Sequence, residues 1–332
     1  MGTNLRRDIA HLSRRRFIAS AAVVGTGLAL SDSGPFRAES ASAQGAAATP
    51  PDTERHRAAT NSISTNDGVR IFYEDVGAGR PVLLIPGWGC TRNFFRKNIA
   101  PLADSFRVIA LDLRGHGDSE KVYWGHRISR YAKDLKDLIE ALGLEHVTAI
   151  GWSMGASIIW SYVDLFGNEH LAGIVNVDQS PRQYNDAAWR WGTPECDDAE
   201  ALARLTIRLG YDPAGAARRL VTQCFGDTYR PTPAEIESLA REIDKCPGAV
   251  RAAIMSDHTH LDWRDLFPQM RLPALACVGR QSKMFPWEGS AYVGEHIPGA
   301  RTMFFEHSGH MSFYEEPDKF NQTVRDFVLS LS

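Results

Sequence analysis

The chain has 332 residues, of which 43% are hydrophobic, and its formal net charge is −3. That apolar content is typical of a soluble domain with a well-packed core. The 37 basic residues form no basic patch, which argues against nucleic acid as a partner, and no charge run suggests binding to an anionic membrane. The length suits one large domain, or one domain that carries an insertion.

Residues 1–43 have the pattern of an export signal. Ser13-Arg14-Arg15-Arg16-Phe17-Ile18 is a twin-arginine motif, an apolar run of small residues follows up to Leu30, and Ala41-Ser42-Ala43 offers a cleavage site. The apolar run is shorter than the roughly 20 residues of a membrane-spanning helix. We therefore expect twin-arginine export, cleavage near Ala43 and a periplasmic or secreted location. The alternative is a disordered, alanine-rich tail with chance arginines.

A flexible lead-in is expected over residues 44–60, which are rich in Ala, Pro and Thr. From residue 61, strand-like and helix-like segments alternate. The expected strands are Val69–Tyr73, Pro81–Ile85, Phe106–Leu111, His146–Ile150 and Leu171–Val177. The expected helices are Thr91–Ala103, Ser129–Leu142 and Ala156–Phe166. Continuous apolar strands separated by helices predict an α/β fold, with a mostly parallel central sheet and helices on both faces.

The alternation stops after Asp178 and resumes near Leu272. Residues 183–258 are richer in charge, show no clear strand and predict several short helices. We therefore expect a helical lid at 183–258, inserted into a core formed by 61–182 and 259–332. Beyond the lid, the strand and helix segments expected are Leu272–Val278, Pro286–His296, Arg301–Phe305 and Pro317–Leu331.

One motif in the core carries recognisable chemistry. Gly151-Trp152-Ser153-Met154-Gly155 is a G-x-S-x-G sequence between an expected strand and an expected helix. In that context the serine stands on a sharp turn that presents its hydroxyl at the top of the sheet. Glycines suit the positions where strand and helix approach closely. The motif predicts Ser153 as a nucleophile.

A nucleophilic serine needs a base and donors for the developing oxyanion. His310 is the predicted base, because it follows the last expected strand and precedes the final helix. His258 and His260 are expected to be ordinary surface or core histidines. The backbone N–H of Met154 and that of Trp88, in Gly87-Trp88-Gly89, are the predicted oxyanion donors.

Four motifs in chain order resemble the α/β-hydrolase superfamily, over roughly residues 65–331. They are Pro86–Gly89, Asp112–Ser119, Gly151–Gly155 and Ser308–His310. The resemblance implies the α/β-hydrolase fold with a Ser–His–acid triad, and a structural role for the Asp112–Ser119 loop. Pro86 stands where many members have histidine, which need not matter to a backbone donor.

The triad acid departs from the usual pattern of that superfamily. Most relatives have Gly-x-x-Asp after the penultimate strand, and here Ser282 stands at the aspartate position of Gly279-Arg280-Gln281-Ser282. We predict that Asp178, at the end of the strand that follows the nucleophile helix, supplies the carboxylate. A minority of the family resembles this relocated arrangement. The weaker rivals for the acid are Glu288, Asp262 and Asp265.

A serine nucleophile argues against the dehalogenase and epoxide-hydrolase chemistry of this fold, which uses aspartate. We expect cleavage of an ester or lactone through an acyl-enzyme on Ser153, with no cofactor and no metal. Trp152, Phe94 and Trp189 are expected in the substrate pocket, which favours an apolar or aromatic substrate. Cofactor-free perhydrolase or haloperoxidase activity and C–C bond hydrolysis share the triad and stay open. A ligand-binding protein on a hydrolase scaffold is the alternative of another class.

The five cysteines show no zinc-site spacing. An exported protein could pair two of Cys196, Cys224 and Cys246. Because twin-arginine substrates are generally exported folded, free buried thiols are the more natural expectation.

Overall fold

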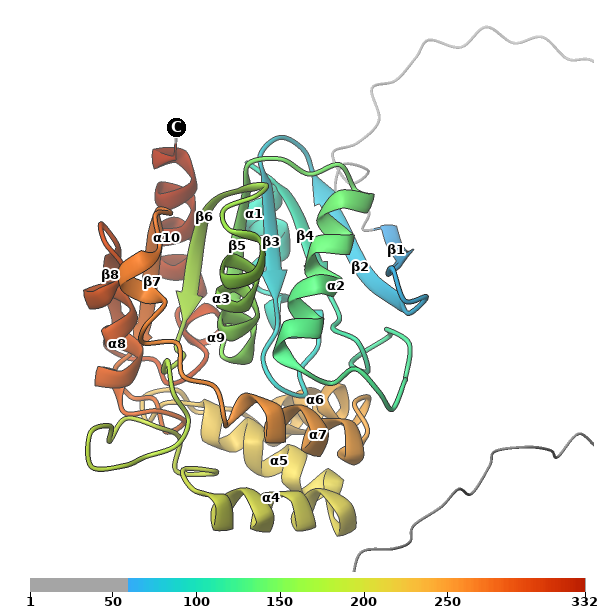
Figure 1. The fold of residues 1–332 in the computed structure, drawn as a ribbon, viewed down its shortest axis with the longest axis vertical. Helices are drawn as coiled ribbons and strands as arrows, with labels where there is room; N and C mark the ends of the chain where they lie inside the picture. Colours follow the sequence, from blue (N-terminus) through green and yellow to red (C-terminus); the bar gives the residue numbers. More distant parts are fainter. Residues whose placement is uncertain (1–58, 332) are drawn as a thin grey trace, which may run out of the picture. The chain divides into compact units, whose positions relative to one another are not determined.

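The computed structural model describes residues 59–331 (Figure 1). The predicted export signal at 1–43 and most of the predicted lead-in lie outside this range. An eight-stranded sheet forms the centre, in the order β1-β2-β4-β3-β5-β6-β7-β8. The strands are β1 (Ala59–Ser64), β2 (Arg70–Gly77), β3 (Pro81–Ile85), β4 (Arg107–Leu111), β5 (Val147–Trp152), β6 (Leu171–Val177), β7 (Ala274–Gly279) and β8 (Arg301–Phe305).

The sheet is mostly parallel, as the sequence predicts. β1 pairs antiparallel with β2, β2 pairs antiparallel with β4, and the pairings from β4 through β3 to β8 are parallel. β1 begins at Ala59, two residues inside the stretch predicted to be a flexible lead-in, because its backbone pairs with β2 from Ala59 to Ser64. Residues 59 and 60 therefore belong to the sheet.

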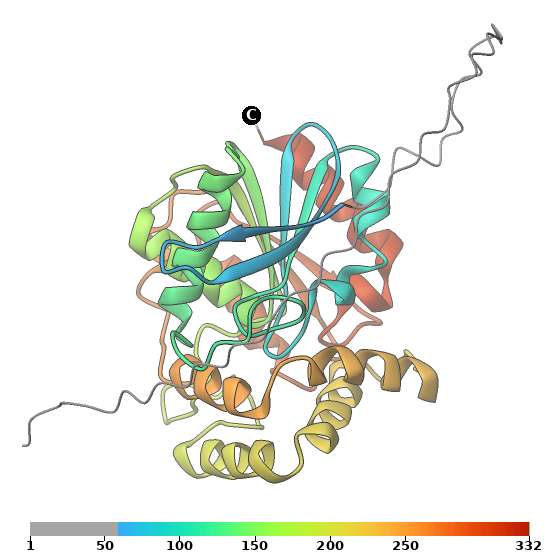
Figure 2. The same cartoon turned by 90° about the vertical axis from the view of Figure 1, so that its right-hand side faces the viewer.

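Helices cover both faces of the sheet. Figure 2 shows α2 and α3 on one face and α1 and α10 on the other. The helices outside the lid are α1 (Ile99–Ala103), α2 (Ile128–Ala141), α3 (Met154–Phe166), α8 (Trp287–His296), α9 (Ser312–Glu315) and α10 (Pro317–Ser330), with 3-10 turns η2 (Arg92–Phe95) and η3 (Phe267–Gln269). None of the described helices is long and apolar enough to cross a membrane.

The single helix expected at Thr91–Ala103 is two short ones, η2 and α1. Thr91 caps η2 by accepting a hydrogen bond from the Asn93 N–H. The Asn98 amide donates to Phe313 O and to Asn321 Oδ1, each at 2.9 Å. These two bonds attach Asn98, which lies between η2 and α1, to α9 and α10.

Four helices lie within residues 183–258, which we call the lid. They are α4 (Ala199–Tyr211), α5 (Pro213–Cys224), α6 (Pro233–Asp244) and α7 (Gly248–His258). Several lid helices have clear start signals, such as the Thr232–Glu235 capping box of α6. Figure 1 shows the lid helices together beyond the end of the sheet toward which the β3 and β6 arrows point. In α/β sheets this carboxyl end is where ligands bind.

Candidate active site

Ser153 lies on the sharp turn between β5 and α3. Its backbone has φ 53° and ψ −126°, a conformation that costs free energy in a residue other than glycine. The two flanking glycines make the turn possible. A Cβ on Gly151 would lie 2.4 Å from Gly155 C, and a Cβ on Gly155 would lie 2.4 Å from Ile85 O. The strained serine and the close approach are the features of a nucleophile elbow.

The predicted oxyanion loop lies directly against the serine. A Cβ on Gly87 would be 3.1 Å from Ser153 Cβ, so the Gly87–Trp88 peptide is adjacent to the nucleophile. Met154 is the first residue of α3, and the first N–H groups of a helix have no partner within it. The Trp88 indole donates to Arg251 O of α7 at 2.8 Å, which fixes this loop to the lid.

Asp178 follows β6 and bonds to the histidine. Its Oδ2 lies 2.7 Å from His310 Nδ1. Asp178 is 1% exposed, and the same carboxylate accepts hydrogen bonds from Ser282 Oγ at 2.6 Å and from Ser290 Oγ at 3.0 Å. A His310 tautomer with its hydrogen on Nδ1 donates to this carboxylate, and in that tautomer Nε2 is an acceptor.

Ser282 occupies the position at which most relatives carry the acid. In this chain its hydroxyl donates to the Asp178 carboxylate. The Ser290 contact comes from α8, and no pattern in the sequence indicates it. Of the rival carboxylates, Asp262 is bonded to Arg264 at 2.6 Å.

The loop that carries His310 is held from two sides. Trp152 Nε1 donates to His310 O at 2.9 Å, and His310 N donates to Cys224 O of the lid at 2.8 Å. Within the described residues the Ser153 hydroxyl makes no hydrogen bond to His310. Such bonds often form only when substrate is present.

Glu315 lies at the base of this loop. Its carboxylate accepts from Gly309 N at 3.0 Å and from Gly226 N at 2.8 Å, and so joins the histidine loop to the end of α5. Burial raises the pKa of Glu315 to about 7, although the two backbone hydrogen bonds act against that shift. No pattern in the sequence indicates a role for this carboxylate.

A narrow cavity of about 40 Å³ opens beside Ser153 and His310, between the sheet and the lid. Its apolar lining includes Trp88, Trp152, Leu205, Leu220, Met255 and Phe285. The lid therefore supplies much of the surface that a substrate would contact.

Of the three residues expected in the pocket, Trp152 lines this cavity and the other two do not. Phe94 is fully buried behind Trp152, with ring centroids 5.3 Å apart. Trp189 is 2% exposed and packs on Trp191 and Tyr292. The expectation for Phe94 and Trp189 is corrected accordingly: both rings are packing groups.

Three polar side chains on the cavity lining were not expected there. Gln179 follows the acid directly, Gln183 begins the lid, and His258 ends α7. His258 Nε2 lies 3.0 Å from Ser157 Oγ, one helical turn beyond the nucleophile. The sequence interpretation of His258 as an ordinary histidine missed its place on the cavity, because only the fold brings α7 against α3.

All five cysteines are buried and unpaired. Cys90, Cys196 and Cys224 line the cavity. Burial raises the pKa of each thiol, and that of Cys246 reaches about 12. These thiols are therefore protonated at neutral pH and behave as small apolar groups.

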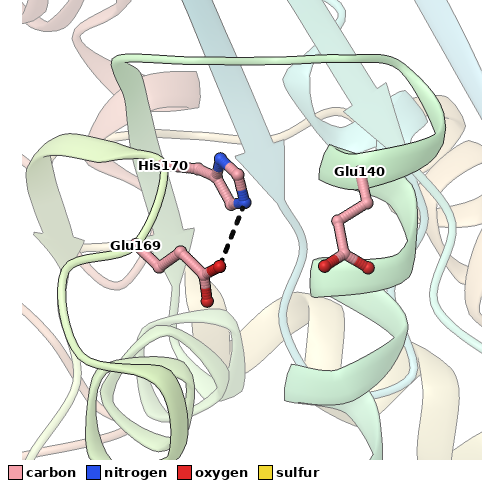
Figure 3. Close-up of side chains that lie close together, drawn as sticks. All are labelled: Glu140, Glu169 and His170. Carbon is pink, nitrogen blue, oxygen red and sulfur yellow. Dashed lines mark ion pairs between the residues drawn. The ribbon is translucent and has the colours of Figure 1, made fainter.

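Outside the cavity, Glu140, Glu169 and His170 form a cluster of possible metal ligands (Figure 3). A cation already lies between its carboxylates, since Lys136 Nζ is 3.0 Å from Glu140 and 2.6 Å from Glu169. The Glu169 carboxylate raises the pKa of the Lys136 ammonium. The cluster is a surface ion-pair network that joins α2 to the turn before β6.

Comparisons with known proteins agree with this fold. Residues 80–317 match the family model described as alpha/beta hydrolase fold. A non-heme chloroperoxidase from Kitasatospora aureofaciens is 29% identical over 279 residues, which are 80% of this chain and 98% of that protein. Both the family and this relative cover the elbow and the lid.

Two solved structures are similar along most of their length. A thermophilic esterase from Thermogutta terrifontis has a TM-score of 0.71 and 27% identity, covering 81% of this chain and 98% of its own. An esterase from Exiguobacterium antarcticum has a TM-score of 0.76 at 24% identity, with 81% and 99% covered. Since the family match spans most of the chain, the protein belongs to the α/β-hydrolase fold family and is a hydrolase.

Proposed function

We propose that the protein is a serine hydrolase that cleaves a carboxylic ester or lactone through an acyl-enzyme on Ser153. The observation that carries this proposal is the 2.7 Å hydrogen bond from His310 Nδ1 to Asp178 Oδ2, next to the cavity that His310 and Ser153 line. That bond sets the tautomer in which Nε2 can accept the serine proton. The esterase named among the similar structures at 27% identity supports the same class of substrate.

The proposed reaction has two halves. Ser153 Oγ attacks the carbonyl carbon while His310 Nε2 takes its proton, and the backbone N–H groups of Trp88 and Met154 stabilise the oxyanion. The alkoxide leaves with the proton from His310, which gives the acyl-enzyme. Water, deprotonated by His310, then attacks the acyl carbon, and Ser153 leaves with the returned proton.

A fluorophosphonate probe followed by a panel of p-nitrophenyl esters and lactones tests this function. We expect covalent labelling on Ser153 and turnover of short and medium acyl esters. The absence of both labelling and turnover in folded protein would favour a ligand-binding role on the hydrolase scaffold.

A second activity is favoured by the chloroperoxidase relative. If hydrogen peroxide replaces water in deacylation, the product is a peracid, which oxidises halide without a cofactor. Bromination of phenol red in acetate and peroxide measures this activity. We expect Ser153→Ala to abolish it together with ester hydrolysis, since both need the acyl-enzyme.

We also propose that the protein is exported through the twin-arginine machinery. The support is the motif that contains Arg14 and Arg15, followed by an apolar run and the Ala41-Ser42-Ala43 site. Replacement of both arginines by lysine should keep the full-length chain in the cytoplasm. Cell fractionation and the N-terminal sequence of the mature protein measure the outcome, and unchanged export would contradict it.

A further inference from the structure

The buried polar side chains on the lining of the cavity beside Ser153 include Gln179, Gln183 and His258, which we call the polar wall. Each of them is at most 3% exposed. A buried polar atom without a hydrogen bond costs free energy comparable to a lost bond. The bonds that the polar wall does and does not make therefore indicate what a ligand could supply.

His258 is held in one tautomer. Its Nε2 lies 3.3 Å from Gln183 Nε2, an amide nitrogen that can only donate, and 3.0 Å from Ser157 Oγ. The ring is neutral, because burial lowers the pKa of His258 to about 3. Since Nε2 accepts, Nδ1 carries the hydrogen. Within the described residues Nδ1 has no hydrogen-bond partner, so His258 is an unused donor.

Gln179 is the complementary case. Its amide nitrogen donates to Ser180 O at 2.7 Å, which fixes the orientation of the amide. The oxygen, Oε1, has no partner within the described residues. Gln179 is therefore an unused acceptor directly after the triad acid. Of the described buried side-chain atoms without a partner, His258 Nδ1 and Gln179 Oε1 are the two whose residues line this cavity.

The charges at the cavity favour a neutral ligand group. Glu195 and Arg208 both line the cavity, and they bond to one another at 2.5 Å. Arg219, which also lines it, lies 3.5 Å from Asp212. A ligand carboxylate or ammonium would meet no free countercharge among these pairs, and burial of an unpaired charge is costly.

We propose that the polar wall is a specificity subsite for a neutral group that carries both a hydrogen-bond donor and an acceptor, as a secondary amide or a hydroxyl does. His258 Nδ1–H donates to its acceptor atom, and Gln179 Oε1 accepts from its N–H or O–H. This inference rests on the proposed ester or lactone hydrolysis and names the substrate class within it.

The subsite lies close to the reacting carbonyl. Gln179 is the neighbour of Asp178 in the chain, and the Ser157 hydroxyl that holds His258 is one helical turn from Ser153. The recognised group is therefore expected within a few bonds of the scissile carbonyl. Buried polar groups that are left unpaired by the wrong substrate are an effective source of discrimination.

A matched set of p-nitrophenyl esters tests the subsite on the unmodified enzyme. N-acetylglycinate carries an N–H and a C=O, 4-oxopentanoate has the same chain length with the C=O alone, and pentanoate has neither. With kcat/KM normalised to each ester's hydroxide-catalysed rate, we expect N-acetylglycinate to exceed pentanoate by about 10- to 100-fold, with 4-oxopentanoate between them. The 3-hydroxypentanoate ester tests whether the recognised group is a hydroxyl. A higher normalised kcat/KM for this ester than for N-acetylglycinate would also support the subsite.

Variants of His258 locate the effect. In His258→Gln the amide can replace Nε2 toward Ser157 but cannot replace the Nδ1 donor. We therefore expect the ratio of normalised kcat/KM for N-acetylglycinate to that for pentanoate to fall below about 3. His258→Asn places a donor near Nδ1 and should keep most of the preference. His260→Gln is the matched control, because that ring is exposed and bonds to Ser256 O, and it should keep the wild-type ratio.

Several results would overturn the subsite. These are equal normalised rates for N-acetylglycinate and pentanoate in the wild type, or a His258→Gln enzyme that keeps the full preference. Equal rates for the amide and the ketone would contradict the role of Gln179. Each of these leaves the hydrolase function standing, whereas no turnover of any ester together with no labelling of Ser153 would remove that function itself.

Discussion

Ser153 and His310 line the same cavity as the polar wall, but the Asp178–His310 pair and the polar wall differ in how completely their polar atoms are bonded. The Asp178 carboxylate accepts hydrogen bonds from His310, Ser282 and Ser290. His258 and Gln179, by contrast, each keep one buried atom without a partner among the described residues. The difference fits two proposed tasks: Asp178 and His310 are bonded to one another before substrate arrives, and the recognition groups are completed by the substrate.

The largest expected effect comes from removal of the nucleophile. Ser153→Ala should lower kcat for p-nitrophenyl esters by about 10⁶-fold, with a residual rate from the oxyanion donors and binding. Steady-state kinetics on the purified variant measure this, with a Tm measurement to show that the fold is intact. A loss of less than about tenfold would exclude the acyl-enzyme on Ser153.

The next effect is that of the relocated acid. Asp178→Asn should lower kcat by roughly 10⁴-fold, because the amide favours the wrong imidazole tautomer and cannot stabilise the imidazolium. The matched control is Asp262→Asn, a rival carboxylate that is bonded to Arg264, and it should retain nearly the full rate. The reverse pattern would assign the acid to Asp262.

A smaller effect is expected at the position that relatives use for the acid. Ser282→Ala removes a 2.6 Å hydrogen bond to the carboxylate and should lower kcat/KM by about 10- to 100-fold. Ser330→Ala, the same change at the end of α10 on the surface, should have no effect. If Ser282→Ala also leaves kcat/KM unchanged, the Ser282 hydroxyl makes no contribution to the function of Asp178.

The smallest effect concerns the loop beneath the histidine. Since the pKa of Glu315 is raised to about 7, the folded state holds its proton between pH 4.5 and 7 while the unfolded state loses it. The contribution of Glu315 to stability is therefore full below about pH 4.5 and is lost as pH rises toward 7. Glu315→Gln should remove this slope, on the order of 1–3 kcal/mol.

The free energy of unfolding of both proteins, measured by urea denaturation from pH 4.5 to 7.5, tests this expectation. A wild-type curve that stays parallel to that of Glu315→Gln across the range would contradict the raised pKa.

The sequence predicts local features well and contacts across the fold poorly. The elbow at Gly151–Gly155, the parallel strands and the lid segment follow from glycine spacing and apolar runs, which are local. The contact of Asp178 with His310 could be predicted because Asp178 follows a strand and the usual aspartate position holds Ser282. Ser290, Glu315 and His258 could not, since their roles depend on which elements pack together.

Whether an aromatic side chain lines the cavity also depends on contacts across the fold. Phe94 and Trp189 are aromatic, as many pocket residues are, but both rings are buried against other rings. Trp152 does line the cavity, and it also donates to His310 O, which makes it a positioning group. Residue type alone does not separate a packed ring from a cavity-lining one.

The proposed hydrolase function depends most on the activation of Ser153 by His310 and Asp178. The rate of covalent labelling by a fluorophosphonate, with the modified peptide identified by mass spectrometry, tests it most directly. We expect modification of Ser153 in the wild type and labelling slower by orders of magnitude in Asp178→Asn. Labelling of another residue, or equal rates in the two proteins, would contradict the account.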